Sequence, residues 1–408
     1  MKKRICHWLD SNQWGALHII SNRVYSCAPR SVPLLVDDDL DFSQITFDEL
    51  HNARTSLYEG INDGTRKECD GCKYLMEKDE SDICVGPVEN VILHPYTTCN
   101  LRCSYCYFTD KELGAAFDQH KAHIVPVLEN FYNSGILKKN FFSLSLGGGE
   151  PAFVRDLKET LDFLSSKWEH SSFVLISNSS IKQKVPYVIE SLNSTPNVTK
   201  TLITSIDCGT RETYKRMRGR DLFIDSVENI QTYATSGVFA DITLKYILLE
   251  DGTNDSPDDV FGFARFVKDI AEKNPHTTSV VIDADVKVTK SASDTYFKTS
   301  IDPDNVDVFT YKPITDDMLV AAGKLYYAIH TLLGVEVKFA GGRLSDRSDV
   351  GTRDVGRIKE YAEQYHSSRK PAKERHFLKA IKPVPGLKTI FLRKLKSLVK
   401  RLIRRKSP

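Results

Sequence analysis

Short apolar runs alternate with longer amphipathic runs from about residue 87 onward. The short runs are rich in Val, Ile and Phe, as strands are, and the longer runs carry apolar residues at helical spacing. The expected strands are Val88–Leu93, Phe141–Leu146, Phe173–Ile176, Thr201–Ile206, Ala240–Leu249 and Ser279–Ile282. The expected helices cover residues 119–134, 154–167, 185–193, 222–236 and 257–273. This alternation predicts an α/β fold whose parallel sheet is built from βαβ units.

Six such strands with their crossover helices predict a partial (β/α)6 barrel over residues 86–300. In folds of this kind the chemistry sits at the carboxyl ends of the strands, in the loops that follow them. The unusual motifs of the chain fall at these places, one after each of the first four strands. They are HPYTTCNLRCSYC, GGGEP, SNSS and SID, in that order.

The remaining segments differ in composition from the barrel. Residues 1–85 are rich in cysteine, with one helical pattern near 46–60. Residues 301–350 extend the barrel with a helix over 315–334 and a short strand, Val335–Phe339. Residues 351–408 form a basic tail that holds 18 of the 56 Lys and Arg but only 4 of the 54 Asp and Glu. The body is therefore acidic and the tail basic, which predicts different partners for the two.

The chain of 408 residues has a mean hydropathy of −0.32, which is typical of a globular protein. It has no apolar run long enough to cross a bilayer, and its first 15 residues lack the apolar stretch of a secretory signal. We therefore expect a cytoplasmic protein in a reducing environment, where thiols persist.

Nine cysteines, an odd number, argue against a disulfide framework. Eight of them lie within the first 106 residues, which favours metal or cluster binding. Cys99, Cys103 and Cys106 have the spacing C-x3-C-x2-C, so their thiolates can converge on one cluster. Three ligands leave one iron of a [4Fe–4S] cluster open, which is the mark of a catalytic centre. A zinc site is the alternative that the spacing leaves open.

The stretch CNLRCSYC, with the aromatic Tyr105 before its last cysteine, resembles the cluster loop of radical S-adenosylmethionine (SAM) enzymes. The resemblance extends over about residues 87–285. It implies a [4Fe–4S] cluster held by Cys99, Cys103 and Cys106, SAM as cosubstrate, and an electron donor of the flavodoxin or ferredoxin type. It also implies reductive cleavage of SAM, which yields a radical that takes a hydrogen atom from a substrate.

The same resemblance implies a set of SAM contacts. The GGGEP motif corresponds to the strand end at which the backbone and a Glu contact the SAM amino group. The SNSS motif corresponds to a Thr-Asn-Gly strand end, and SID to the ribose-binding strand, with Ser205 and Asp207 expected on one face. Arg218 corresponds to a basic residue that can hold the SAM carboxylate. The implied cofactor-binding residues are Gly147, Gly148, Gly149, Glu150, Pro151, Tyr105, Asn178, Ser205, Asp207 and Arg218.

The N-terminal cysteines resemble those of SPASM or twitch modules, which hold auxiliary clusters. We expect four of them to bind a second [4Fe–4S] cluster; a structural zinc site and unliganded thiols are the alternatives. Cys84 could replace one ligand, but a lone cysteine is more often a small buried apolar residue. Cys208 stands beside Asp207 and could lie near the active site, but we expect it to be a packed core thiol. The four expected ligands are Cys6, Cys27, Cys69 and Cys72.

The tail carries apolar residues at helical spacing over 387–406, with Lys and Arg filling most other positions. This pattern predicts an amphipathic helix that lies on an anionic membrane surface, with docking on the acidic body as the alternative. Nothing in the sequence indicates specific nucleic-acid binding.

Three functions remain open at this point. The first is radical chemistry on a sugar or glycan-type or peptide substrate, with an auxiliary cluster as electron acceptor. The second is the maturation of ribosomally made peptides, and the third is a noncatalytic zinc- or cluster-binding role. Polar residues near later strand ends are candidates to face a substrate, although each is more often a structural charge. They are Lys245, Asp283 and Asp285.

Overall fold

The computed structural model describes residues 1–20, 23–27, 32–36, 40–70, 72, 74–95, 98–106, 123–284, 314–339 and 349–368. The chain divides into two compact units, Met1–Ala362 and Glu363–Pro408, and the barrel lies in the first. The expected tail helix over 387–406 and the candidate Asp285 lie outside the described residues.

The parallel sheet expected from the sequence is confirmed. Six strands lie side by side in chain order, each parallel to the next. They are β6 (Asn90–His94), β7 (Phe142–Leu146), β8 (Ser171–Ser177), β9 (Val198–Ser205), β10 (Asp241–Leu248) and β11 (Thr277–Ala284). The arrangement is that of a partial (β/α) barrel.

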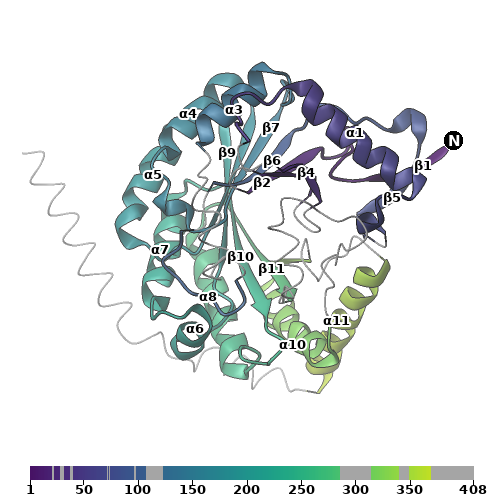
Figure 1. Cartoon of the computed structure of the whole chain (residues 1–408). Coiled ribbons are helices and arrows are strands. Elements are labelled where there is room, and N and C mark those ends of the chain that lie inside the picture. Colours follow the sequence, from purple (N-terminus) through teal and green to yellow (C-terminus); the bar gives the residue numbers. More distant parts are fainter. Residues whose placement is uncertain are drawn as a thin grey trace, which may run out of the picture. The chain divides into compact units, whose positions relative to one another are not determined.

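The crossover helices line the outer side of this sheet (Figure 1). The connections between successive strands run through α3, α4 and α5, then through α6 and α7 together, and last through α8. Their bounds are α3 (Ile124–Asn133), α4 (Leu157–Lys167), α5 (Val185–Asn193), α6 (Arg211–Arg218), α7 (Phe223–Ser236) and α8 (Pro257–Lys273).

Along β7, successive side chains point alternately to a buried outer face and to an inner face of the sheet. In β7, Phe142, Leu144 and Leu146 are completely buried, while Ser143 and Ser145 between them are partly exposed. Trp168 packs against this outer face, stacked on Phe142 with ring centroids 4.8 Å apart. Burial of large apolar side chains between sheet and helices stabilises the fold. Small polar side chains on the inner face leave the carboxyl edge of the sheet accessible for a site.

The described residues after β11 add helical segments and one further strand to the sheet. Helix α10 (Asp316–Tyr326) passes into a π-helical turn, η6 (Tyr327–Thr331), and the short strand β12 (Glu336–Lys338) pairs parallel with β11. A last helix, α11 (Asp349–Ser367), follows.

The cysteine-rich N-terminal segment is joined to the barrel sheet. Strand β2 (Ala16–Ile20) pairs parallel with β6, and β3 (Arg23–Tyr25) and β4 (Pro33–Val36) follow antiparallel at the edge. Separately, β1 (Lys2–Cys6) pairs with β5 (Leu75–Asp79). Helix α1 (Phe47–Asp63) begins with a capping box formed by Thr46 and Glu49. Main-chain hydrogen bonds therefore connect this segment to the first barrel strand.

Candidate active site

The three cysteines expected to hold a cluster lie on the loop after β6, and that loop is fixed at both ends. The Glu150 amide donates to the Thr98 carbonyl at 2.9 Å, which ties the start of the loop to the end of β7. The Arg102 and Ser104 amides donate at 2.9 Å to the Arg218 and Met217 carbonyls in the last turn of α6. The cysteine loop is thus held between two strand ends and one helix terminus.

Two of the loop thiols receive hydrogen bonds from the barrel. The Cys99 sulfur accepts from the Leu101 amide at 3.4 Å and from the Asn178 side-chain amide at 3.5 Å. The Cys103 sulfur accepts from a guanidinium nitrogen of Arg218 at 3.3 Å. Burial raises the pKa of Cys99, and the charges of Glu150 and Cys103 raise it further, so Cys99 and Cys103 act on one another. Donors directed at sulfur are typical of the surroundings of thiolate ligands.

Among the described residues, no three or more side chains of His, Cys, Asp or Glu are arranged so that they could hold a single metal ion. The chemistry of the loop nevertheless fits iron, since it presents three soft thiol donors with N–H groups directed at two of them. The residues present therefore suit a cluster with three protein ligands.

The glycine-rich edge lies directly beside β6. A Cβ atom on Gly147 would come 3.1 Å from the His94 imidazole Nε2, so the strand ends pack closely there. Gly148 has φ +98°, a backbone conformation that favours glycine. Gly148 and Gly149 are partly exposed, which leaves main-chain groups accessible to a ligand. Pro151 begins a short 3-10 turn and is buried.

The Glu150 carboxylate is fully buried and links two strand ends through hydrogen bonds. It accepts hydrogen bonds from the Ser177 hydroxyl at 2.6 Å, the Asn178 amide at 2.7 Å and the Ala152 amide at 3.0 Å. Burial raises its pKa, and these hydrogen bonds oppose the shift. The carboxylate thus joins the end of β7 to the end of β8. At this edge of the sheet, the groups accessible to a ligand are those of the glycine main chain.

Asn178 connects the third strand end to the cysteine loop. Its side-chain amide donates to Asn100 at 3.0 Å as well as to Cys99, and its oxygen accepts from the Ser180 hydroxyl at 2.6 Å. Ser179 adopts φ +56° at the position where the family motif has glycine. The conformation expected of a Thr-Asn-Gly strand end is therefore kept with a serine.

The expected placement of Asp207 is wrong. Strand β9 ends at Ser205, and Asp207 adopts φ +59°, so the two residues do not share a strand face. The Asp207 carboxylate is fully buried and accepts from the Tyr105 hydroxyl at 2.5 Å, from the Ile247 amide at 2.8 Å and from Arg218. It is occupied by the protein, so a ribose contact does not fit it. Ser205 remains partly exposed at the strand end.

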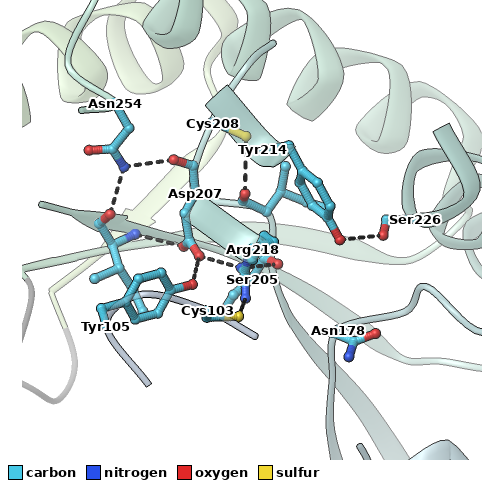
Figure 2. A network of polar contacts seen from close by, with 12 residues as sticks. Cys103, Tyr105, Asn178, Ser205, Asp207, Cys208, Tyr214, Arg218, Ser226 and Asn254 are labelled. Carbon is cyan, nitrogen blue, oxygen red and sulfur yellow. Dashed lines mark hydrogen bonds and ion pairs between the residues drawn. The ribbon is translucent and has the colours of Figure 1, made fainter. Parts of the chain in front are cut away.

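Arg218 is likewise engaged within the protein through both terminal nitrogens of its guanidinium. Its guanidinium is buried, forms an ion pair with Asp207, and donates to the Ser205 carbonyl at 2.6 Å and to Cys103 (Figure 2). Burial alone would lower the pKa of Arg218, but the buried Asp207 carboxylate raises it above its ordinary value. The residue expected to contact the cosubstrate carboxylate contacts Cys103.

The N-terminal cysteines gather in one buried group. Cys6, Cys27 and Cys69 are buried in one apolar cluster, and Cys72 packs against it. Burial raises the pKa of Cys6 well above its ordinary value, and repulsion from Cys27, Cys72 and Cys69 adds to the shift. Cys27, Cys69 and Cys72 are therefore each within electrostatic range of Cys6.

A buried arginine lies beside this group. Arg54 is 2% exposed and donates to the carbonyls of Gly86 at 2.6 Å and Leu9 at 2.7 Å. It forms no ion pair with a carboxylate among the described residues; burial lowers its pKa to about 10, and the nearby sulfurs of Cys84 and Cys6 oppose the shift. Burying a cation without a counter-charge is costly, so thiolates in this group would stabilise it.

Other candidates are accounted for within the protein. Cys208 is buried, and its thiol donates to the Ile206 carbonyl at 3.4 Å, as a packed core cysteine does. Lys245 and Asp283 form an ion pair of 3.2 Å across β10 and β11.

Sequence reasoning missed several residues that hold the site together. Asn254 is completely buried and donates to the carbonyls of Asp207 and Ile247, both at 2.7 Å. Asp259, at the start of α8, accepts from the Gly209 and Thr210 amides. Both side chains form hydrogen bonds with residues that lie about fifty positions earlier in the sequence. Only Asp259 has a local sequence signal, because it follows the Ser256 N-cap of α8.

A pair of histidines was also missed. His18 Nε2 and His94 Nδ1 are 3.2 Å apart, on the paired strands β2 and β6. Burial lowers the pKa of His94 to about 4, and the pKa of His18 lies well below its ordinary value for the same reason. The pair is neutral near pH 7.

Comparison with known families agrees with this geometry. Residues 93–264 match the profile of the Radical SAM superfamily. This part of the chain belongs to that superfamily, which implies an enzyme that binds a [4Fe–4S] cluster and SAM. No helix in the described ranges combines the length and apolarity that a bilayer crossing requires.

Among solved structures, the chain is similar to SuiB from Streptococcus suis, with 15% identity and a TM-score of 0.41 over 72% of this chain and 55% of SuiB. It is also similar to a radical SAM methyltransferase from Sphaerobacter thermophilus, with 12% identity and a TM-score of 0.39 over 61% of this chain and 65% of that one. The chain thus spans little more than half the length of SuiB. No curated protein matches it.

Proposed function

We propose that this protein is a radical SAM enzyme that removes a hydrogen atom from a sugar or glycan-type or peptide substrate, with Cys99, Cys103 and Cys106 as the ligands of its catalytic cluster. When bound, the cluster and SAM would supply a 5′-deoxyadenosyl radical. The observation that carries the proposal is the fixation of the cysteine loop by two main-chain hydrogen bonds: Glu150–Thr98 joins it to the glycine-rich strand end, and Arg102–Arg218 joins it to helix α6.

The glycine-rich edge is the proposed contact for the amino acid part of SAM. Main-chain groups of Gly148 and Gly149 are accessible there, without side chains in the way. Ser205 is partly exposed at the end of β9 and can donate to a ribose hydroxyl. Asn178 and Arg218 position the cysteine loop, and Glu150 and Asp207 hold these two residues in turn.

The N-terminal group is the proposed site of a second [4Fe–4S] cluster, with Cys6, Cys27, Cys69 and Cys72 as ligands. Support comes from the gathering of the four thiols and from the adjacent buried cation of Arg54. A cluster there would accept an electron from the substrate, so the net reaction would be an oxidation. We further propose a flavodoxin- or ferredoxin-type electron donor and attachment of residues 387–406 to an anionic membrane surface from the cytoplasmic side.

The test is release of 5′-deoxyadenosine from SAM after anaerobic reconstitution with iron and sulfide, with dithionite as reductant. We expect the wild-type protein to release it and Cys103→Ala to lose the activity while keeping its circular dichroism spectrum. Cys208→Ala is the matched control, because that buried thiol lies outside both cysteine groups, and it should keep the activity. Zinc occupancy without any SAM cleavage would support the noncatalytic alternative instead.

A further inference from the structure

The guanidinium of Arg218 donates a hydrogen bond to a sulfur of the cysteine loop, so the donor at this sulfur carries a positive charge. One terminal nitrogen of its guanidinium lies 3.3 Å from the Cys103 sulfur, and the other pairs with Asp207 and with the Ser205 carbonyl (Figure 2). The side chain of Arg218 is 6% exposed and that of Asp207 is fully buried. The cation therefore acts on Cys103 without screening by bulk water.

The guanidinium is held in this orientation by groups that are themselves fixed. Asp207 accepts from the Tyr105 hydroxyl and the Ile247 amide, and its own carbonyl accepts from Asn254. The rings of Tyr105 and Tyr214 lie 5.4 and 5.8 Å from the guanidinium carbon, close enough for cation–π attraction. Rotation of Arg218 away from Cys103 would break several of these contacts together.

A further donor of Arg218 has no acceptor. Its Nε–H is buried and has no hydrogen-bond partner among the described residues. Buried donors are rarely left unpaired, and a water or an anionic group can satisfy this one. A cluster on three thiolates carries a net negative charge, which increases on reduction.

Cys99 provides a comparison within the same loop. Its side-chain donor is the neutral amide of Asn178, at 3.5 Å, rather than a cation. Hydrogen bonds from charged groups are shorter and about twice as strong as neutral ones. Variants of Arg218 and Asn178 can therefore be compared: the first removes a cationic donor to Cys103, and the second removes a neutral donor to Cys99.

We propose that Arg218 is a positioning residue that sets the reduction potential of the catalytic cluster, raising it through a fixed cationic N–H···S contact with Cys103. This inference rests on the proposed function. A nearby cation stabilises the more negative, reduced cluster over the oxidised one, and hydrogen bonds to ligand sulfur act in the same direction. Asp207 and Tyr105 hold the cation in place.

The experiment is a potentiometric titration of the reconstituted protein followed by electron paramagnetic resonance, in Cys6→Ala/Cys27→Ala proteins so that the signal belongs to the catalytic cluster alone. We expect Arg218→Gln to shift the midpoint to more negative values, Arg218→Lys to shift it less, and Asn178→Ala to shift it least. Arg211→Gln is the matched control, because Arg211 lies on the same helix, is exposed and pairs with Asp221.

An unchanged midpoint in Arg218→Gln at full iron content would overturn the inference. If Arg218→Gln holds no cluster, Arg218→Lys decides, since a midpoint below that of the wild type supports the inference and an equal one overturns it. Absence of a cluster from the wild-type protein would refute the proposed function itself, a result distinct from a variant whose potential does not move.

Discussion

Gly219 lies against Arg102, at the crossing of helix α6 and the cysteine loop. A Cβ atom on Gly219 would come 2.8 Å from the Arg102 carbonyl oxygen, and Gly219 has φ +69° at the C-cap of the helix. The glycine thus satisfies two demands together, since it ends α6 in the left-handed conformation and leaves room for the loop. The position of Cys103 depends on this crossing.

We predict that Gly219→Ala displaces the cysteine loop, because neither the backbone of Arg102 nor the positive φ accommodates a methyl group. Iron bound after reconstitution should fall by roughly half if the auxiliary site remains loaded. Gly64→Ala is the control, because Gly64 also caps a helix with positive φ but a Cβ there meets nothing. Equal iron content in both variants would contradict the role of the crossing.

Asp207→Asn should destabilise the protein by about 3 kcal/mol, because it leaves the buried guanidinium of Arg218 without its counter-charge. Urea denaturation of the metal-free protein measures this. Asp221→Asn removes the carboxylate from the exposed pair with Arg211 and should change the stability little. A similar decrease in the free energy of unfolding in the two variants would show that the buried ion pair contributes no more to stability than the exposed one.

Stability should fall as the pH decreases from about 6.5 to about 4, in part because of the histidine pair. The pKa of His94 is lowered to about 4 in the folded protein, whereas an unfolded His titrates near 6.5. Between these values the unfolded chain binds the additional proton, so stability is complete above pH 6.5 and is lost on acidification. Urea midpoints at pH 5 and pH 7.5 should differ less in His94→Asn than in the wild type; an equal difference would contradict this.

Arg54→Met should reduce metal binding by the N-terminal cysteines and leave the catalytic cluster intact. The buried cation lies within electrostatic range of Cys6 and Cys84, so its removal takes away the charge that stabilises thiolate ligands. Iron content should decrease while SAM cleavage is kept. Lys67→Met, which removes an exposed cation of the same segment, is the control and should bind iron like the wild type.

The elements of the barrel could be predicted because each strand and helix carries its own periodic pattern. The failures concern contacts between distant segments. The alternation of Ser205 and Asp207 indicated a shared strand face, but the chain leaves the strand and turns Asp207 toward Ile247, forty residues away. Asn254 was not singled out for the same reason, since its contact with the Asp207 carbonyl spans 47 residues. The pairing of β2 with β6 was missed because residues 1–85 were assigned to a cysteine-rich segment separate from the barrel.

The central claim is that three thiolates of one loop hold a catalytic cluster, and iron counting tests it most directly. After anaerobic reconstitution, the Cys99→Ala/Cys103→Ala/Cys106→Ala protein should contain about four fewer iron and sulfide ions per chain than the wild type, and release no 5′-deoxyadenosine. A triple variant with the iron and sulfide content of the wild type, or one that still cleaves SAM, would contradict the account.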